Sequence, residues 1–190
     1  MRMKDDNKKN AITKAVISLS NEIGFSDVSM SKIAERAGVS SSTLYVYYEN
    51  KDDMFNKVYA DVKIQMHKEC VKGLEMNETV ENSVKKICKN VLRYIQEYTE
   101  EFLFIEQSCN SPFATEEVLN EIEQHSKEIV GIFERGIKEG VLKQTSPILL
   151  ISFCYYPIQQ IFKEYRKPNS MLPDTDFNMV FQMCWDAIKR

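Results

Sequence analysis

The residues best suited to chemistry lie in one short segment near the N-terminus, where hydroxyl groups are dense and charges are absent. The segment reads SSSTLYVYY over residues 40–48. Small serine and threonine side chains let a helix settle deep into the major groove of DNA, and their hydroxyls can bond base edges or phosphates. Tyrosine hydroxyls near the end of the segment can do the same. The candidate contact residues in this segment are Ser40, Ser41, Ser42, Thr43, Tyr45 and Tyr47.

The segment belongs to a stretch with the spacing of a helix-turn-helix. Residues 29–48 predict two short helices, the first capped by Ser29 and the second by Ser40. Ala34 lies four residues before Gly38, which suits a close helix crossing followed by a turn with a left-handed backbone. The apolar residues at the remaining offsets predict the buried faces, and they are Ile33, Ala37, Val39, Leu44 and Tyr48. Such spacing also occurs in helical proteins that have no role in DNA binding.

Helical periodicity also dominates the rest of the chain, and strand alternation is nearly absent. We therefore expect an all-α protein of about nine helices. Before the helix-turn-helix, a helix over 8–23 is expected to end at Gly24. After it, apolar stripes predict helices over about 50–73, 80–98, 102–109, 118–140, 147–166 and 175–189. Breaks are expected at 110–112 and 167–173, where prolines occur, and Pro157 should kink the helix that contains it.

Composition narrows the class of protein further. The chain has 190 residues, of which 43% are hydrophobic and 28% charged, as in a globular protein with a sizeable core. No apolar run is long enough to span a membrane, and the five cysteines occur singly, which suits a reducing cytoplasm. Residues 1–51 carry a net charge of +2 and residues 52–190 a net charge of −5, so the first quarter is the more basic part.

The string GF-x3-S-x3-IAERAGVSSSTLYVYYENKDDMF resembles the signature of the TetR family of bacterial transcriptional regulators, over about residues 9–58. A generic helix-turn-helix does not bring the Tyr-x-x-aromatic-x-x-Lys tail formed by Tyr45, Tyr48 and Lys51. The resemblance implies a three-helix DNA-binding domain over 1–51 and a ligand-binding and dimerisation domain over 52–190. It also implies a ligand-responsive homodimer, most often a repressor, that leaves a palindromic operator when a small-molecule inducer binds.

Carried over by position, the resemblance assigns a phosphate contact to Ser29 and the major groove to Ser40 to Thr43. Tyr45, Tyr47 and Lys51 are then expected to hold phosphates. Two of the groove positions depart from the family pattern, since Ser41 stands where Lys or Arg is frequent and Ser42 where Gly is frequent. Tyr47 replaces a frequent His, which keeps a hydrogen-bonding group and removes any charge. The operator sequence therefore does not follow from the resemblance.

The expected ligand-binding and dimerisation domain over 52–190 resembles the family more weakly, through its architecture and the run from Gly136 to Gly140. Apolar faces on the helices over 147–166 and 175–189 predict either a hairpin within the chain or, as the family implies, half of a four-helix dimer interface. We favour the dimer. The residues expected to line a pocket for an apolar or aromatic inducer are Met66, Phe102, Ile105, Cys109, His125 and Phe133. Each of them also fits an ordinary helical core.

No motif indicates an enzyme or a cofactor, because phosphate-binding loops, dinucleotide-binding glycines, zinc-protease and nucleophile-elbow patterns are absent from the sequence. His67 and Cys70 have the spacing of half a zinc site, but no second pair of ligands is placed near them, so no metal is expected. An alternative is a helical ligand-binding or interaction module that has lost DNA binding. Burial or internal pairing of Tyr45 and Lys51 favours that alternative.

Overall fold

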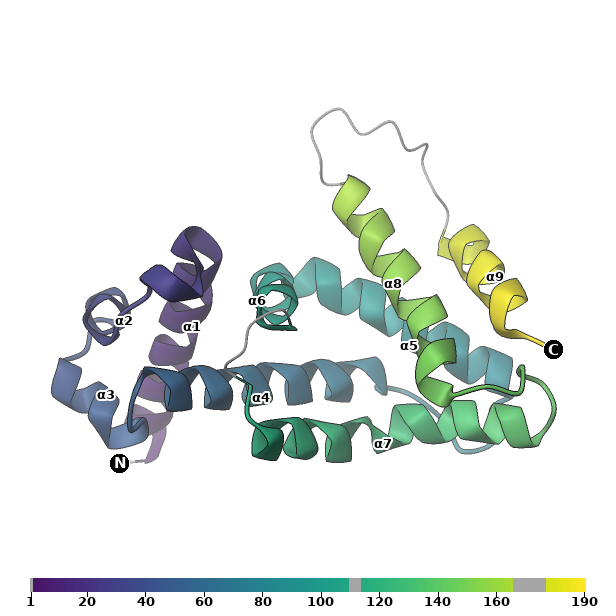
Figure 1. The fold of residues 1–190 in the computed structure, drawn as a ribbon, viewed down its shortest axis with the longest axis horizontal. Coiled ribbons are helices and arrows are strands. Elements are labelled where there is room, and N and C mark those ends of the chain that lie inside the picture. The colour runs from purple at the N-terminus through teal and green to yellow at the C-terminus, as the bar shows by residue number, and fades with distance from the viewer. Residues whose placement is uncertain (1, 110–113, 166–176) are drawn as a thin grey trace. The chain divides into compact units, whose positions relative to one another are not determined.

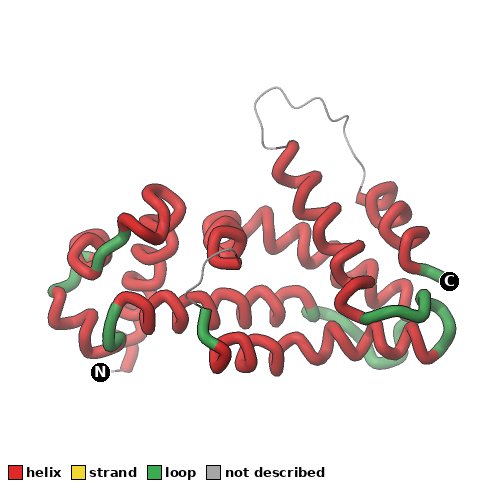
Figure 2. Tube along the Cα trace, in the orientation of Figure 1, coloured by secondary structure: helices red, strands yellow, loops and turns green. Residues whose placement is uncertain are grey.

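The structure, a computed structural model, describes residues 2–109, 114–165 and 177–190, and within these ranges the chain forms nine helices and no strand (Figures 1 and 2). The all-α prediction is confirmed. The expected breaks at 110–112 and 167–173 lie outside the described residues. The helices are α1 (Arg2–Asp27), α2 (Met30–Ala37), α3 (Ser41–Tyr47), α4 (Lys51–Cys70), α5 (Val80–Glu97), α6 (Thr99–Cys109), α7 (Glu116–Lys138), α8 (Pro147–Tyr165) and α9 (Phe177–Ile188).

Helix α1 starts earlier than its apolar stripe indicates. The stripe predicts a start at residue 8, whereas the helix begins at Arg2. The six additional residues are mostly polar, so periodicity gives no sign of them, although the segment contains no helix breaker. The predicted break is confirmed, because Gly24 has the non-helical angles φ 75° and ψ 159°, and the residues from Phe25 to Asp27 form a short helical stretch after this kink within α1.

Helix α4 begins as its capping residues predict. The side-chain Oδ1 of Asn50 accepts a hydrogen bond from the backbone N–H of Asp53 at 2.9 Å, and Asp53 Oδ2 accepts one from the N–H of Glu49 at 2.9 Å. The helix ends at Cys70, three residues before the expected Gly73. The buried amide of Asn90 on α5 donates to the carbonyls of Cys70 and Lys72, so a tertiary contact satisfies the end of this helix.

The described chain forms two compact units. The first contains residues 1–64 and 98–122, and the second contains residues 65–97 and 123–190. The predicted functional boundary at residue 51 therefore does not coincide with the division by packing. In the first unit, Phe25 packs edge-on against Phe55 of α4 and Phe104 of α6, with ring centroids 5.1 and 5.6 Å apart. The Gly24-Phe25 pair of the sequence signature thus anchors the end of α1 to this core.

The second unit is built on α5, α8 and α9, which pack on one another (Figure 1). The side chains of Leu142 and Val80 pack closely against Gly136 of α7. A Cβ atom at this position would lie only 2.6 Å from the Leu142 side chain and 2.7 Å from that of Val80. The thiols of Cys88, Cys154 and Cys184 are all free and buried in this unit. A hydrogen bond with Cys154, together with burial, raises the pKa of the Cys88 thiol, so this group stays protonated.

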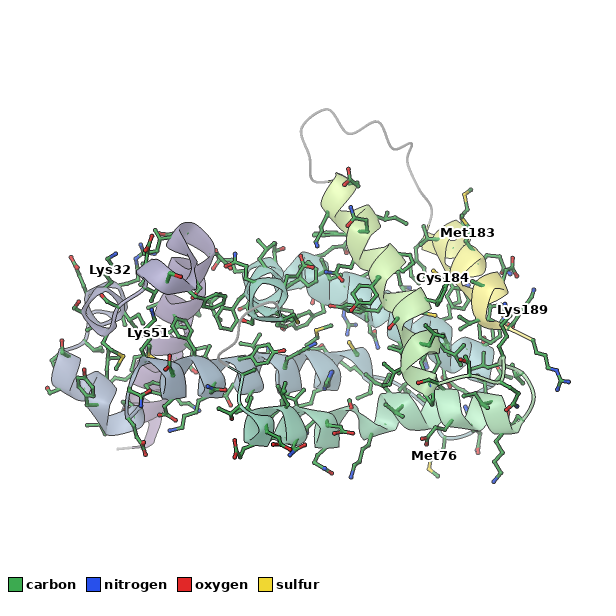
Figure 3. All side chains as sticks on the ribbon, viewed as in Figure 1. Lys32, Lys51, Met76, Met183, Cys184 and Lys189 are labelled. Carbon is green, nitrogen blue, oxygen red and sulfur yellow. The ribbon has the colours of Figure 1, made fainter. Side chains whose placement is uncertain are left out.

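The apolar faces predicted for α8 and α9 pack against other helices of the same chain, so the expectation that these same faces form the dimer interface is wrong. The apolar face predicted for α9 is buried at Val180, Phe181, Cys184, Trp185 and Ile188, whereas Phe177, predicted on the same face, is only half-buried. Figure 3 shows Cys184 on the side of α9 that faces α8. Other large apolar side chains remain exposed, at Ile148, Leu149, Phe153 and Tyr156 on α8 and at Met179 and Met183 on α9, and these six residues are called the second apolar face. The predicted kink at Pro157 stays a prediction, and α8 continues through this residue.

None of the helices in the described ranges combines the length and apolar character needed to cross a membrane.

Candidate nucleic-acid interface

Two serines start the helices of the helix-turn-helix, as predicted. Ser29 is the N-cap of α2, and its Oγ accepts a hydrogen bond from the backbone N–H of Lys32 at 3.4 Å. Ser40 is the N-cap of α3, and its Oγ accepts from the N–H of Thr43 at 3.2 Å. Both caps have extended backbone angles, which is the conformation that lets a side chain fold back onto the first turn.

The turn between α2 and α3 depends on Gly38. Its backbone lies in the left-handed region at φ 66° and ψ 33°, and its N–H returns to the carbonyls of Ala34 and Glu35. Ala34 is buried at the crossing, as the sequence indicates, and Leu44 of α3 is fully buried. The predicted burial of Tyr48 is also confirmed, because only 2% of this residue is accessible. The orientation of α3 is therefore set by its own buried residues.

The outward face of α3 carries the predicted hydroxyl groups. Ser41, Ser42 and Tyr45 are exposed, while Thr43 and Tyr47 are half-buried. The Ser40 Oγ lies 2.8 Å from both the Ser42 Oγ and the Thr43 Oγ1. Hydrogen bonds among these hydroxyls restrict the side-chain rotamers at the start of α3. A DNA contact therefore costs less side-chain entropy than it would with freely rotating hydroxyls.

Val46 is a residue on this face that sequence reasoning missed. This residue is 78% exposed, compared with 59% for the neighbouring Tyr45. It lies two residues from both Leu44 and Tyr48, and a displacement of two positions is about 200° around a helix. The burial of these two neighbours thus predicts that Val46 points outward, and the helical spacing alone contained this signal.

Lys51 is only partly available. Its Nζ donates to the carbonyl of Ser26 at 3.3 Å and lies 5.7 Å from the centroid of the Phe55 ring. Figure 3 labels this side chain at the start of α4. An ammonium group has three N–H donors, so the bond to Ser26 leaves capacity for a phosphate and also fixes the position of the charge.

Three other cations near the helix-turn-helix, Lys9, Lys32 and Arg36, form local contacts. Arg36 on α2 makes a two-pronged ion pair with Glu22, with N–O distances of 2.7 and 2.8 Å. This hydrogen bonding raises the pKa of Arg36 and lowers that of Glu22. Lys9 pairs with Asp61 at 3.0 Å, and the Nζ of Lys32 donates to the carbonyl of Asp27. These groups tie the helices of the first unit together.

The residues expected to line an inducer pocket divide by burial. Met66, Phe102, Ile105 and Phe133 are buried, whereas Cys109 is exposed and its Sγ lies 3.8 Å from the hydroxyl of Tyr59. The expectation that His125 lies on the inward side of its helix is wrong, because the side chain is exposed. The buried line of α7 runs through Ile122, Ile129 and Phe133, and His125 is about 60° from Ile122 around the helix.

The described residues contain no group of three or more His, Cys, Asp or Glu side chains arranged to hold a metal ion.

Family models match both parts of the chain. Residues 12–58 match the model "Bacterial regulatory proteins, tetR family". Residues 55–190 match "Tetracyclin repressor-like, C-terminal domain". The chain belongs to the TetR family. The first match covers the helix-turn-helix, so this TetR-family protein is a DNA-binding transcription regulator.

Individual relatives agree with this assignment. A TetR-family transcription regulator from Marinobacter aquaeolei VT8 has 26% sequence identity and a TM-score of 0.86, with 100% of this chain and 99% of that chain covered. The HTH-type transcriptional regulator YhgD of Bacillus subtilis is 22% identical over 144 residues, which is 75% of each chain. FadR of Bacillus subtilis, solved in complex with stearoyl-CoA, shares the fold at 18% identity, with a TM-score of 0.71 and 94% and 98% of the two chains covered.

Proposed function

We propose that this TetR-family protein is a homodimeric repressor that binds a palindromic operator through α3 and leaves it when a small-molecule inducer binds. The observation that carries the proposal is the outward face of α3, where exposed hydroxyl groups stand on a helix held by the buried residues Leu44 and Tyr48. Tyr45 is 59% exposed, which disfavours the alternative of a module that has lost DNA binding, whereas the bond from Lys51 to the Ser26 carbonyl is an internal pairing of the kind that the alternative expects. Acting on chromosomal DNA, the protein would work in the bacterial cytoplasm.

Each predicted contact residue has a role in this proposal. Ser41, Ser42 and Thr43 face the base edges, and Ser40 contributes both its cap and its hydroxyl. Ser29 and the two tyrosines, Tyr45 and Tyr47, bond phosphates. Lys51 supplies a positive charge for a phosphate, and the hydrogen bond from its ammonium group to the Ser26 carbonyl orients this side chain.

The dimer is proposed to form through the second apolar face of α8 and α9. Its six large side chains are 48–69% exposed in the single chain, and they lie on two helices that pack on each other. Single exposed apolar residues are ordinary, but a group of this size favours a protein partner. A second copy of the chain is the partner because a two-fold axis places the two half-sites of a palindrome on two identical heads.

The inducer is proposed to be a molecule with a long apolar part and at least one hydrogen-bond donor. Gln159 of α8 is more than nine-tenths buried, and its Oε1 has no hydrogen-bond partner among the described residues. An unpaired buried acceptor is costly, so a donor from a ligand is favoured there. Of the expected lining residues, Met66 and Phe133 are apolar, buried and in the same compact unit as Gln159, and the structural relative FadR was solved with stearoyl-CoA. We place Cys109 and His125 outside the proposed lining because both are exposed.

Release from the operator is proposed to act through α4. This helix is continuous over Lys51–Cys70, and its residues belong to both compact units. An inducer can shift the protein away from the operator-binding conformation only by as much as it prefers the other conformation. Equal inducer affinity for free and operator-bound protein would contradict this mechanism.

The function is tested by selecting binding sites from a random duplex DNA pool at low salt. We expect a palindrome to be enriched, and we expect Tyr45→Ala and Lys51→Ala to weaken binding to the selected site. The control is Lys127→Ala, which removes an exposed charge from α7. Failure to enrich any duplex with a folded dimer would contradict the proposal.

The inducer class is tested on the selected operator with saturated fatty alcohols and acyl-coenzyme A thioesters of increasing chain length, because both kinds of ligand carry a hydrogen-bond donor. We expect the longer chains to release the operator and to raise the melting temperature of the free protein. Gln159→Leu should bind the operator normally and respond less to these ligands. Release that does not depend on chain length contradicts the apolar class.

A further inference from the structure

The outward face of α3 has an apolar group at its centre. Leu44 is fully buried, and Val46 lies about 200° around the helix from it; the C-cap residue Tyr48 is also buried, at 2% accessibility. Ser42 precedes Val46 by one turn and therefore shares its face. This serine is small, so it leaves the valine methyl groups standing above their surroundings.

The chemistry of α3 limits which base edges it can read. The helix has the sequence SSTLYVY, so it offers neither Arg nor Lys to the O6 and N7 acceptors of guanine. It also lacks Asn and Gln, which pair with adenine. Hydroxyl groups bond several bases without strong preference. The one apolar group that DNA exposes in the major groove is the 5-methyl group of thymine, and it matches an exposed valine.

We propose that Val46 contacts a thymine methyl group in each half-site of the operator and so determines which base is preferred at that position. The inference rests on the proposed function, since it requires that α3 enter the major groove. Contact between the valine and thymine methyl groups removes both from water, which favours binding. This favourable free energy is lost when a cytosine or a purine occupies the position.

The test pairs a protein variant with a change in one DNA methyl group. After a duplex has been selected, each thymine of the half-site is replaced by deoxyuridine, which removes the methyl group and keeps the base pair. The affinity of each duplex is measured for the wild type and for Val46→Ala. Because Val46 is exposed, the variant should fold normally, and its circular dichroism and oligomeric state check this. The matched control is Val141→Ala, which truncates another exposed valine, in the turn after α7.

The expected result is coupling between the two changes. At one thymine position, replacement in both half-sites should weaken wild-type binding on the order of tenfold, from about one buried methyl group per half-site. Val46→Ala should lose a similar factor on the thymine duplex and be insensitive to the replacement, while Val141→Ala should behave as the wild type.

Two other outcomes overturn the inference, and they are distinguishable from failure of the proposed function. If a palindrome is enriched and Val46→Ala loses as much affinity on replacement as the wild type, the valine does not read the methyl group. The same holds if no thymine replacement affects the wild type. If no duplex is enriched at all, the proposed function and this inference both fail.

Discussion

Helix α3 and the pair α8–α9 both expose apolar side chains, but what surrounds these side chains differs. On α3 one valine stands among hydroxyl groups, whereas α8 and α9 present six large apolar residues together. The first surface suits a polar partner with isolated methyl groups, such as a DNA groove. The second suits a continuous apolar partner, such as another copy of itself. The number and neighbours of exposed apolar groups, rather than their presence, therefore separate the two proposed interfaces.

The largest expected effect comes from placing a charge on the α8–α9 face. Figure 3 shows Met183 standing out from α9, and 69% of this residue is exposed. In the proposed dimer, Met183→Glu buries an unpaired carboxylate, which should cost roughly 3–5 kcal/mol of association free energy. We expect a monomer by analytical ultracentrifugation, and loss of operator binding with it.

Met76→Glu is the matched control for this change. Met76 is 95% exposed and lies between α4 and α5, where no dimer contact is proposed. The Met76→Glu variant should remain dimeric. An unchanged dimer in both variants would place the interface elsewhere.

A smaller effect is expected from the single charge proposed to contact DNA from the start of α4. Lys51→Ala should weaken operator binding about tenfold and lower the slope of log affinity against log salt by about 2, because a dimer loses two phosphate contacts. Titrations at several salt concentrations measure both quantities. Lys127→Ala should leave the slope unchanged. If Lys51→Ala also leaves it unchanged, Lys51 serves only its contacts with Ser26 and Phe55.

The cap of α3 tests whether the hydroxyl groups of this helix also stabilise it. Ser40→Ala removes the acceptor for the Thr43 N–H and should lower the free energy of unfolding by about 1 kcal/mol. Urea denaturation measures the change. Ser41→Ala, on the neighbouring exposed position, should have almost no effect on stability. Equal losses in the two variants would show that the cap bond does not contribute.

The smallest effect concerns acid stability at the start of α4. Burial alone would raise the pKa of Asp53, but hydrogen bonds from Lys57 and from the Glu49 N–H outweigh it and lower the pKa. A carboxyl with a lowered folded-state pKa stabilises the protein above its unfolded pKa, which is about 3.9, and this contribution disappears as the pH falls. Between pH 6 and pH 3, Asp53→Asn should therefore lose less stability than the wild type. Parallel pH profiles of urea unfolding for the two proteins would contradict this.

The helix-turn-helix was predictable because its signals are local. Ser29, Gly38 and Ser40 act on residues within one or two turns of themselves, so their types and spacing determine where α2 and α3 begin and end. The prediction that Tyr48 is buried follows from the same spacing. Val46 was available to the same reasoning, and it was missed because hydroxyl groups, rather than the helical face, guided the choice of contact residues.

Other features depended on contacts between distant segments. The end of α4 at Cys70 is satisfied by Asn90, twenty positions away along the chain. His125 lies at the edge of the apolar stripe of α7, where periodicity is consistent with a buried or an exposed side chain. The tertiary structure leaves it exposed.

The sequence by itself determined the helical class, the caps and turn of the helix-turn-helix, and the uncharged recognition helix, since these follow from residue types and short-range spacing. Only the tertiary structure decided which apolar face of α8 and α9 is buried within the chain and which stays exposed. It also decided that Lys51 is held by the Ser26 carbonyl and that Gln159 has a buried oxygen with no hydrogen-bond partner in the described parts of the chain. The physical reason is that burial and hydrogen-bond pairing depend on residues that the fold brings together from far apart in the chain.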